Sequence, residues 1–272
     1  DDPRSLCEAW CSSATWRLVS LFSPVLSSRV HLAKSRTETD PAPRGRYHHG
    51  DLARELMQAS LAILSEVGAD GLSLREAARR AGVNHRAVYR HYEDKRALLA
   101  AIAEAGYRQL AADLRAAVDA ASTAAESGRR AVFIAIAEAY LHFALRERAR
   151  FHVMFGPRLN QDERFPSLEA AIKDTVSVLA RELKRAGPDT PSALRRDAGI
   201  TLWSTMHGLS SLVLAPRIQL RESHVHSYVT KVVAPVVDGL LALLRAQPGQ
   251  RTAPPGGRSD RKSALQPARP AP

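Results

Sequence analysis

Residues 71–99 carry the sequence GLSLREAARRAGVNHRAVYRHYEDKRALL, and this stretch decides the fold. Ser73 is followed three residues later by Glu76, which is the spacing of a capping box, so a helix is predicted to begin at Leu74. The helix is predicted to end at Gly82, because glycine commonly adopts the left-handed backbone that terminates a helix. The stretch therefore opens with one short helix and a tight turn.

A second short helix is predicted directly after this turn. Asn84 is a favourable N-cap residue and predicts a helix over residues 85–92. Asp94 can cap a further helix that begins at Lys95. Two short helices joined by a tight turn that contains glycine form a helix-turn-helix, whose second helix fits the major groove of DNA.

Basic side chains dominate residues 79–96 of this stretch. On the second helix His85, Arg86 and Tyr89 can share one face, and Ala87 is small enough to allow close approach to a base edge. Two interpretations stay open on the pattern alone: this face binds DNA, or it is the solvated face of a helical pair. The basic residues are Arg79, Arg80, Arg86, Arg90, Lys95 and Arg96.

The same stretch resembles the signature of the TetR family of bacterial transcriptional repressors, and the resemblance covers residues 44–102. The family has a small residue, Ala-Gly-Val and Ser or Asn in the turn, a tyrosine and a second aromatic residue in the recognition helix, and a lysine at the start of the next helix. Upstream, RYHHGDLARELMQAS at residues 46–60 is similar to the first helix of one TetR subgroup. The matching residues of the stretch are Ala81, Gly82, Val83, Asn84, Tyr89, Tyr92 and Lys95.

The resemblance implies roles for individual side chains. Ser73, Tyr89 and Lys95 would hold phosphates. Family members usually have serine where Asn84 stands and often have a small residue where Arg86 stands, so both departures concern which operator sequence is recognised. The residues that would face the groove are His85, Arg86, Ala87 and His91.

A short basic arm precedes the first helix. Arg44 and Arg46 lie in this arm, and such an arm can reach phosphate or the minor groove. The complete set of predicted DNA-binding residues is Arg44, Arg46, Ser73, Asn84, His85, Arg86, Ala87, Tyr89, Arg90, His91 and Lys95.

The composition favours a polyanionic partner. The chain has 272 residues, is 45% hydrophobic and has a net charge of +11, so it can form a sizeable core and attract nucleic acid or an anionic membrane surface. No apolar run approaches the roughly 20 residues that span a membrane. The two cysteines, Cys7 and Cys11, lie together near the start, so the folded part depends on no disulfide and we expect a cytoplasmic protein.

The chain is predicted to be all-α, since no strand-like alternation follows the helix-turn-helix. We expect a disordered extension over residues 1–43 and an N-terminal three-helix bundle with the helix-turn-helix over 44–94. A larger helical ligand-binding and dimerisation domain is expected over 95–246, followed by a disordered basic tail over 247–272.

Two residues are predicted to interrupt long helices. Gly106 lies inside the helix that begins at Lys95 and is interpreted as a flexible point. Pro235 predicts a kink or break in the last helix. The resemblance implies that movement of the helix from Lys95 would carry a ligand signal to the DNA-binding head.

Trp203 and His207 form the most distinctive pair in the C-terminal half. They are four residues apart and share a helix face, and the pattern W-x-x-x-H-G that ends at Gly208 resembles a ligand-domain motif of the same TetR subgroup. The pair is either a core tryptophan over a satisfied histidine or a site where His207 donates a hydrogen bond to an effector beside an apolar wall. The predicted ligand-binding residues are Tyr140, Phe143, Phe155, Trp203, Met206 and His207.

Other chemistry receives little support from the sequence. His224 and His226 could join His207 in a metal site, but two residues apart on a helix they diverge, so no metal and no cofactor are expected. No nucleophile-base set and no phosphate-binding glycine loop occurs, so we expect no enzyme. Wide apolar stripes on the last two helices indicate a homodimer, which also suits recognition of two DNA half-sites.

The sequence thus predicts a homodimeric, sequence-specific transcriptional regulator that binds a palindromic operator on double-stranded DNA. Repression with release by a small-molecule effector is the preferred mode, with activation left open. A nonspecific nucleoid-type DNA binder is the rival interpretation, because the basic termini would suit it. The identity of the effector does not follow from the sequence.

Overall fold

The computed structural model describes residues 49–123, 128–156, 158–215 and 220–245, and within these residues it has helices and no strand. The predictions for residues 1–43 and 247–272, and those for Arg44 and Arg46, lie outside the described residues. The helices are α3 (His49–Gly71), α4 (Leu74–Ala81), α5 (His85–His91), α6 (Lys95–Thr123), α7 (Arg129–Arg146), α8 (Arg148–Phe155), α9 (Pro166–Ala186), α10 (Ser192–Leu214), η2 (Glu222–His224), α11 (Val225–Tyr228), η3 (Val229–Val233) and α12 (Ala234–Arg245).

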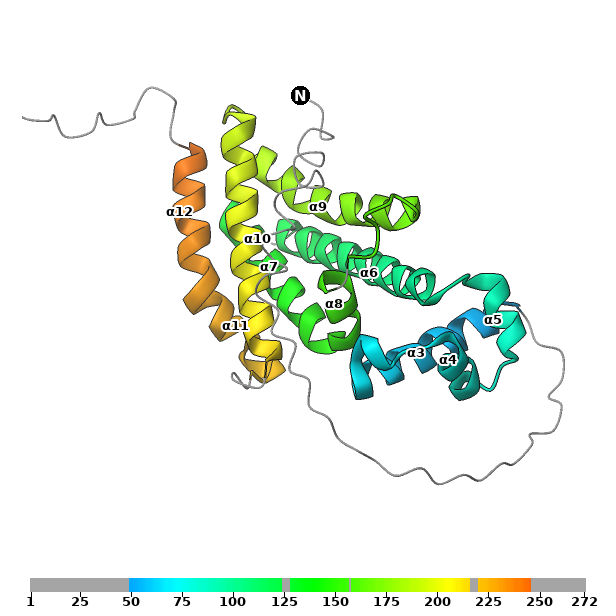
Figure 1. The fold of residues 1–272 in the computed structure, drawn as a ribbon. Helices are drawn as coiled ribbons and strands as arrows, with labels where there is room; N and C mark the ends of the chain where they lie inside the picture. Colours follow the sequence, from blue (N-terminus) through cyan, green and yellow to red (C-terminus); the bar gives the residue numbers. More distant parts are fainter. Residues whose placement is uncertain (1–48, 124–127, 157, 216–219, 246–272) are drawn as a thin grey trace, which may run out of the picture.

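The first three helices, α3 to α5, form a head at one end of the molecule (Figure 1). Leu56, Ile63, Ala77, Val88 and Leu98 in its core have no exposed surface. These residues come from α3, α4, α5 and the start of α6, so one small core holds all four helices together. The predicted N-terminal three-helix bundle is confirmed.

Helix α6 runs from the head into the C-terminal domain (Figure 1). Asp94 caps it, because the backbone N–H of Ala97 donates to Asp94 Oδ1 over 2.7 Å. Its 29 residues correspond to a length of about 44 Å at 1.5 Å per residue. The helix packs against α7, α8 and α9, so it is shared by the head and the C-terminal domain.

Gly106 serves close packing in α6. It is buried, and a Cβ added there would lie 2.5 Å from Sδ of Met154 on α8. The missing side chain lets α8 lie directly against a continuous helix, which gives Gly106 a packing role, and its interpretation as a flexible point stays a prediction.

The C-terminal domain places α10 and α12 side by side along the edge away from the head (Figure 1). The last helical stretch changes its winding to a π-helix over Val229–Val233, immediately before Pro235 on α12. Because proline has no N–H and clashes with the preceding turn, a local change of winding is expected there. The predicted kink or break thus falls at a local change of winding, and the helix continues through Pro235 to Arg245.

Candidate DNA interface and ligand cavity

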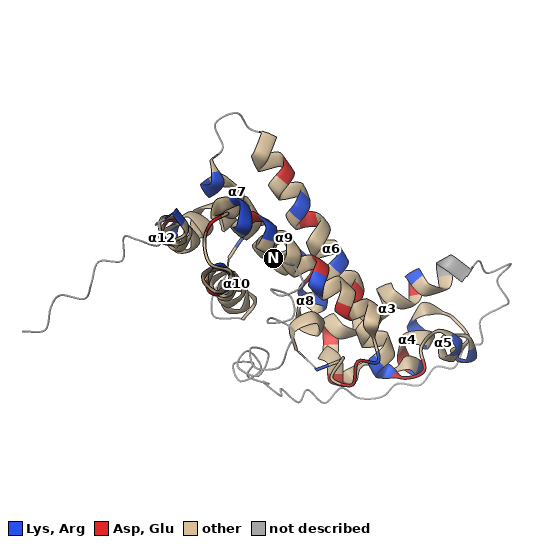
Figure 2. Cartoon of the chain, turned by 90° about the horizontal axis from the view of Figure 1, so that it is seen from above, with Lys and Arg blue, Asp and Glu red and all other residues tan. Residues whose placement is uncertain are grey.

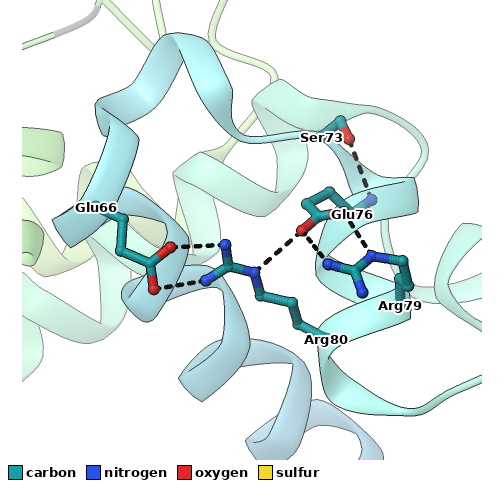
Figure 3. Close-up of polar contacts among 5 residues, drawn as sticks. All are labelled: Glu66, Ser73, Glu76, Arg79 and Arg80. Carbon is teal, nitrogen blue, oxygen red and sulfur yellow. Dashed lines mark hydrogen bonds and ion pairs between the residues drawn. The ribbon is translucent and has the colours of Figure 1, made fainter. Parts of the chain in front are cut away.

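Helix α4 begins at the predicted cap. Ser73 has an extended backbone, and its Oγ accepts the backbone N–H of Glu76 over 3.1 Å. The carboxylate of Glu76 turns to the side chains of Arg79 and Arg80, as Figure 3 shows. Ser73 thus makes its hydrogen bond of the expected capping box, whereas the carboxylate of Glu76 accepts hydrogen bonds from Arg79 and Arg80.

Arg80 connects α4 to α3. Its Nε donates to Glu76 over 3.0 Å, and its Nη1 donates to Glu66 over 2.7 Å (Figure 3). Hydrogen bonds from Arg79, followed by those from Arg80, lower the pKa of Glu76 to about 2. Arg79 and Arg80 thus have acidic partners within the head, and their charges are partly neutralised there.

The turn between α4 and α5 has the predicted geometry. Gly82 has a φ of 65°, and its N–H points to the carbonyl groups of Ala78 and Arg79. Asn84 caps α5, since its Oδ1 accepts the N–H of Arg86 over 2.9 Å. Val88 is completely buried, so it fixes one face of α5 against the head and leaves the opposite face outward.

The outward face of α5 carries most of the predicted DNA-binding residues. Ala87 is half-buried between them, and Tyr89 is 52% exposed, which is unusual for a large apolar ring. Figure 2 shows Lys and Arg on α4 and α5 at this end of the molecule. The exposed residues of α5 are His85, Arg86, Tyr89, Arg90 and His91.

Three other predicted contacts have roles inside the head. Ser73 and Asn84 are exposed, but their side-chain oxygens already accept the N–H groups that they cap. Lys95 is half-buried, and its Nζ donates to the carbonyl of Asp70 over 3.2 Å. A phosphate contact by these residues would therefore add to an existing structural role.

The C-terminal domain encloses a cavity of about 60 Å³ between helices α6, α7, α8, α9 and α10. Its walls are mainly aliphatic and aromatic, and no lining residue is charged. The lining residues are Tyr107, Leu110, Leu114, Ile136, Tyr140, Phe155, Ile172, Thr175, Val176, Leu179, Ile200, Trp203 and Met206.

The polar groups of the cavity wall have partners within the protein. The hydroxyl of Tyr107 donates to the carbonyl of Met154 over 3.0 Å, and Oγ1 of Thr175 lies 2.9 Å from the carbonyl groups of Tyr107 and Ala171. A buried hydroxyl without a partner costs free energy. The hydroxyls of Tyr107 and Thr175 therefore need no partner from inside the cavity.

His207 lies behind this wall and bonds to Tyr140. The Tyr140 hydroxyl lies 3.0 Å from His207 Nδ1, and the indole N–H of Trp203 also hydrogen bonds to Tyr140. Burial lowers the pKa of His207 to about 4, so its ring is neutral at pH 7. Which of the two side chains donates in the Tyr140–His207 hydrogen bond depends on the tautomer of the imidazole.

The six predicted ligand-binding residues divide into two groups. Tyr140, Phe155, Trp203 and Met206 line the cavity. Phe143 is fully buried elsewhere in the core, and His207 stacks on Phe151, with the ring centroids 5.4 Å apart and the rings 20° from parallel, without lining the cavity. The prediction that His207 donates to an effector has less support than the alternative of a satisfied histidine.

The sequence pattern missed the cavity residues on α6 and α9. Ile172, Val176 and Leu179 have the same apolar character and helical spacing as core residues, so no local signal separates them from the core. Thr175 offers a weak signal, since it is one of two polar residues, with Glu182, among the buried residues of α9.

His207 and His226, two of the three histidines considered as a possible metal set, bond to different partners. His226 pairs with Glu138 over 2.6 Å, whereas His207 bonds to Tyr140. Within the described parts of the chain, no group of three or more His, Cys, Asp or Glu could hold a metal ion.

The last two long helical stretches expose large apolar side chains along their outer face. Leu212 on α10 is 54% exposed, and Leu243 on α12 is 44% exposed. Glu222–Arg245 is long and apolar enough to cross a membrane by length and composition, although Lys231 and Asp238 interrupt it. Only 33% of its most apolar window is buried within the single chain, so this stretch has a large uncovered face.

Comparisons with known proteins match both halves of the chain. Residues 56–102 match the family described as bacterial regulatory proteins, tetR family, and residues 133–236 match the family described as tetracyclin repressor-like, C-terminal domain. The tetracycline repressor protein class A from transposon 1721 of Escherichia coli is 52% identical over 50 residues, which are 18% of this chain and 23% of that repressor. The match to this relative therefore spans less than a quarter of its length.

Solved structures share the fold along most of the described chain. A protein of unknown function from Rhodococcus sp. RHA1 is 31% identical, with a TM-score of 0.58 over 73% of this chain and 100% of that chain. A TetR variant from Acinetobacter baumannii AYE, in complex with minocycline, is 20% identical, with a TM-score of 0.51 over 74% of this chain and 100% of that chain. Together with the outward face of α5, the two matched families show that the chain belongs to the TetR family of DNA-binding transcriptional regulators.

Proposed function

We propose that this chain is a homodimeric repressor that binds a palindromic operator and releases it when a small, uncharged and largely apolar molecule occupies the C-terminal cavity. The observation that carries the DNA-binding half is the outward face of α5. Arg86, Tyr89 and Arg90 are exposed there on a helix that Val88 anchors in the head. Arginine can read guanine edges, and tyrosine hydroxyls can hold phosphate.

The uncovered apolar face supports a dimer. Leu212 on α10, Val232 on η3 and Leu243 on α12 are each more than 40% exposed, and these three elements pack against one another. A second copy of the same face would bury them, and a two-fold axis would place two heads on successive major-groove faces about 34 Å apart. This arrangement supports a palindromic operator with half-sites one helical turn apart.

The cavity supports release by an effector. It lies between α6, which continues from the head, and α9, so a molecule that separates these helices would act directly on the helix that carries the head. The absence of charge among the lining residues favours an uncharged molecule, because an unpaired ion in an apolar cavity is strongly disfavoured. The TetR variant from Acinetobacter baumannii AYE, which has a similar fold and was solved in complex with minocycline, supports ligand binding by this fold. We expect the protein to act in the cytoplasm.

Selection from a pool of random duplex DNA tests the proposal. The full chain is incubated with the pool at about 150 mM salt, and the bound DNA is sequenced after several rounds. We expect an inverted repeat with half-sites one helical turn apart. Enrichment of no sequence would instead support the nonspecific nucleoid-type binder, for which the net charge of +11 would suffice.

The effector half has its own test. Trp10 and Trp16 are replaced by phenylalanine, so that Trp203 in the cavity wall is the remaining tryptophan. Uncharged apolar compounds are then screened for a change in Trp203 emission and for release of the selected DNA. Compounds that change the emission should also weaken DNA binding, and by linkage the DNA should weaken their binding by the same factor.

A further inference from the structure

The segment between α8 and α9 lies directly against the DNA-binding head. Arg164 in this connector, residues 158–165, donates from Nη1 to Asp94 Oδ2 over 2.7 Å and from Nη2 to Glu93 Oε2 over 2.6 Å. Glu93 and Asp94 lie between Tyr92, which caps the end of the recognition helix α5, and Lys95, which begins α6, so one guanidinium holds both acids at the junction of the two helices. We call these three residues the Arg164 clamp.

The connector is held to the start of α6 by further contacts. Arg96 pairs with Asp162, and the ring of Phe165 lies beneath two guanidinium groups, 5.4 Å from that of Arg96 and 5.1 Å from that of Arg164. Cations over an aromatic ring attract it and keep their planar groups in place. The clamp is therefore part of a small network, which is more effective than one exposed ion pair.

The backbone of the connector shows that its shape is imposed. Glu163 has a φ of 57°, and among the described residues it is the one other than glycine in the left-handed region. The N–H of Phe165 donates to Asn160 Oδ1 over 2.7 Å and closes the loop. Such a conformation costs free energy and persists where surrounding contacts determine it. In this loop conformation the side chain of Arg164 lies within hydrogen-bond distance of Glu93 and Asp94.

Helices α6 and α9, which begin next to the residues of the Arg164 clamp, both line the cavity. Helix α9 begins at Pro166, two residues after Arg164, and contributes Ile172 and Val176 to the cavity wall. Helix α6 begins at Lys95, and the two helices stay joined where Ser167 Oγ donates to Glu104 over 2.7 Å. A displacement of α9 by a molecule in the cavity would therefore move Arg164 relative to the head.

We infer that Arg164 is a positioning residue, which sets the orientation of the helix-turn-helix by tying Glu93 and Asp94 to the cavity-lining helix α9. The link between cavity and DNA rests on the proposed function, whereas the tie itself can be measured without DNA. Occupancy of the cavity is thereby transmitted to the recognition helix through the connector as well as along α6.

Hydrogen–deuterium exchange of the full chain tests the tie. Arg164→Gln should speed exchange of the amides in α4, α5 and the connector several-fold and leave α12 unchanged. Arg158→Gln is the matched control, because Arg158 is an exposed arginine in the same connector. The side chain of Glu93 is 84% exposed, so Glu93→Gln should leave the fold intact. It should speed exchange in the same segments, but by less than Arg164→Gln. Unchanged exchange in Arg164→Gln, or an equal change in Arg158→Gln, would overturn the inference.

Transmission from the cavity is tested by filling it. Val176→Phe replaces a small aliphatic side chain of the cavity wall by a larger aromatic one. It should speed hydrogen–deuterium exchange in α4 and α5 when Arg164 is present. In the Arg164→Gln background the same substitution should add little. If the effects of Val176→Phe and Arg164→Gln on the exchange of α4 and α5 simply add in the double variant, transmission through the clamp is overturned, since coupled residues deviate from additivity.

Binding to the selected DNA separates positioning from direct contact. Arg164→Gln should lower affinity about three- to tenfold, and the dependence of affinity on salt should keep its slope. A slope reduced by about one would mean that Arg164 contacts a phosphate, and the positioning role would be overturned. If the wild-type chain selects no sequence, the proposed function fails, while the exchange experiment still decides whether the clamp orders the head.

Discussion

The hydroxyl of Tyr140 on α7 lies 3.0 Å from Nδ1 of His207 on α10, and this hydrogen bond joins two helices beside the cavity. A neutral imidazole can accept or donate in this bond, depending on its tautomer, whereas a protonated ring can only donate. Burial lowers the pKa of His207 to about 4, which keeps that neutral form over the physiological range. The C-terminal domain therefore contains a buried histidine whose protonation is disfavoured by its surroundings.

Acid should destabilise the domain through His207. The folded-state pKa of about 4 lies below the ordinary value of 6.5, so the unfolded chain binds the proton more readily. This contribution to stability is present above pH 6.5 and is lost as the pH falls towards 4. By linkage the wild type should lose up to about 2 kcal/mol of unfolding free energy between pH 7.5 and 5.

Urea unfolding at both pH values measures this loss. His207→Phe should be about 1–2 kcal/mol less stable at pH 7.5, because Tyr140 loses its hydrogen-bond partner His207, but less sensitive to acid. His224→Gln, at an exposed position in η2, should keep the sensitivity of the wild type. An unchanged acid response in His207→Phe would contradict the account of this residue.

The carboxylates around Arg80 should stabilise the head. Arg80→Gln removes bonds to both Glu66 and Glu76 and should lower the unfolding free energy, by an amount that solvent screening keeps small. Arg75→Gln on the same helix is the control, as Arg75 is exposed. Urea unfolding followed by circular dichroism gives both values, and equal losses would mean that charge alone matters.

The pKa of Glu76 adds a pH signature to this prediction. Its folded-state pKa of about 2 lies below the ordinary 4.5, so its contribution is present above pH 4.5 and is lost as the pH falls from 4.5 to about 2. Glu76→Gln should remove this component of the acid dependence. An acid titration with the same profile in the variant would assign the dependence to other carboxylates.

Two residues of α5 should affect DNA binding differently. Tyr89→Phe should weaken binding to the selected operator and to random DNA alike, because a phosphate contact carries no sequence information. Arg86→Ala should cost about 1–3 kcal/mol on the operator and relax preference at one base position. Competition binding with single-base variants of the operator measures both effects, and equal losses on all sequences for both variants would refute this division of roles.

The uncovered face of α10 and α12 should hold two copies together. Leu212→Glu, and separately Leu243→Glu, should shift the protein towards monomer in sedimentation experiments and weaken operator binding at least tenfold. Val67→Glu is the control, since Val67 is 58% exposed on α3 and outside this face. A dimer that survives both leucine variants would place the interface elsewhere.

Local signals explain what the sequence predicted well. Ser73, Gly82 and Asn84 act within one turn of the helices that they begin or end, so their residue types and spacing suffice to locate α4 and α5. The long-range contacts were not accessible in this way. Glu66 and Arg80 are fourteen residues apart and Asp94 and Arg164 seventy, so neither pair follows from helical spacing.

The cavity shows the same limit. Tyr140, Trp203 and Met206 could be proposed because aromatic and flexible side chains cluster near a distinctive motif, but Phe143 has the same character and lies in the solid core. Whether an apolar side chain faces a cavity or a neighbouring side chain depends on the packing of several helices. In the sequence, Arg79 and Arg80 add to the positive charge that favours DNA binding. In the fold, both arginines pair with acidic side chains of the head.

A footprint of the full chain on the selected DNA, repeated at rising salt, tests the central claim most directly. A specific dimeric regulator predicts two protected half-sites about one helical turn apart, and at moderate salt the protection should persist on the operator after it has disappeared from flanking DNA. Uniform weak protection that vanishes with modest salt would contradict the claim, since binding would then depend on the positive charge of the chain alone.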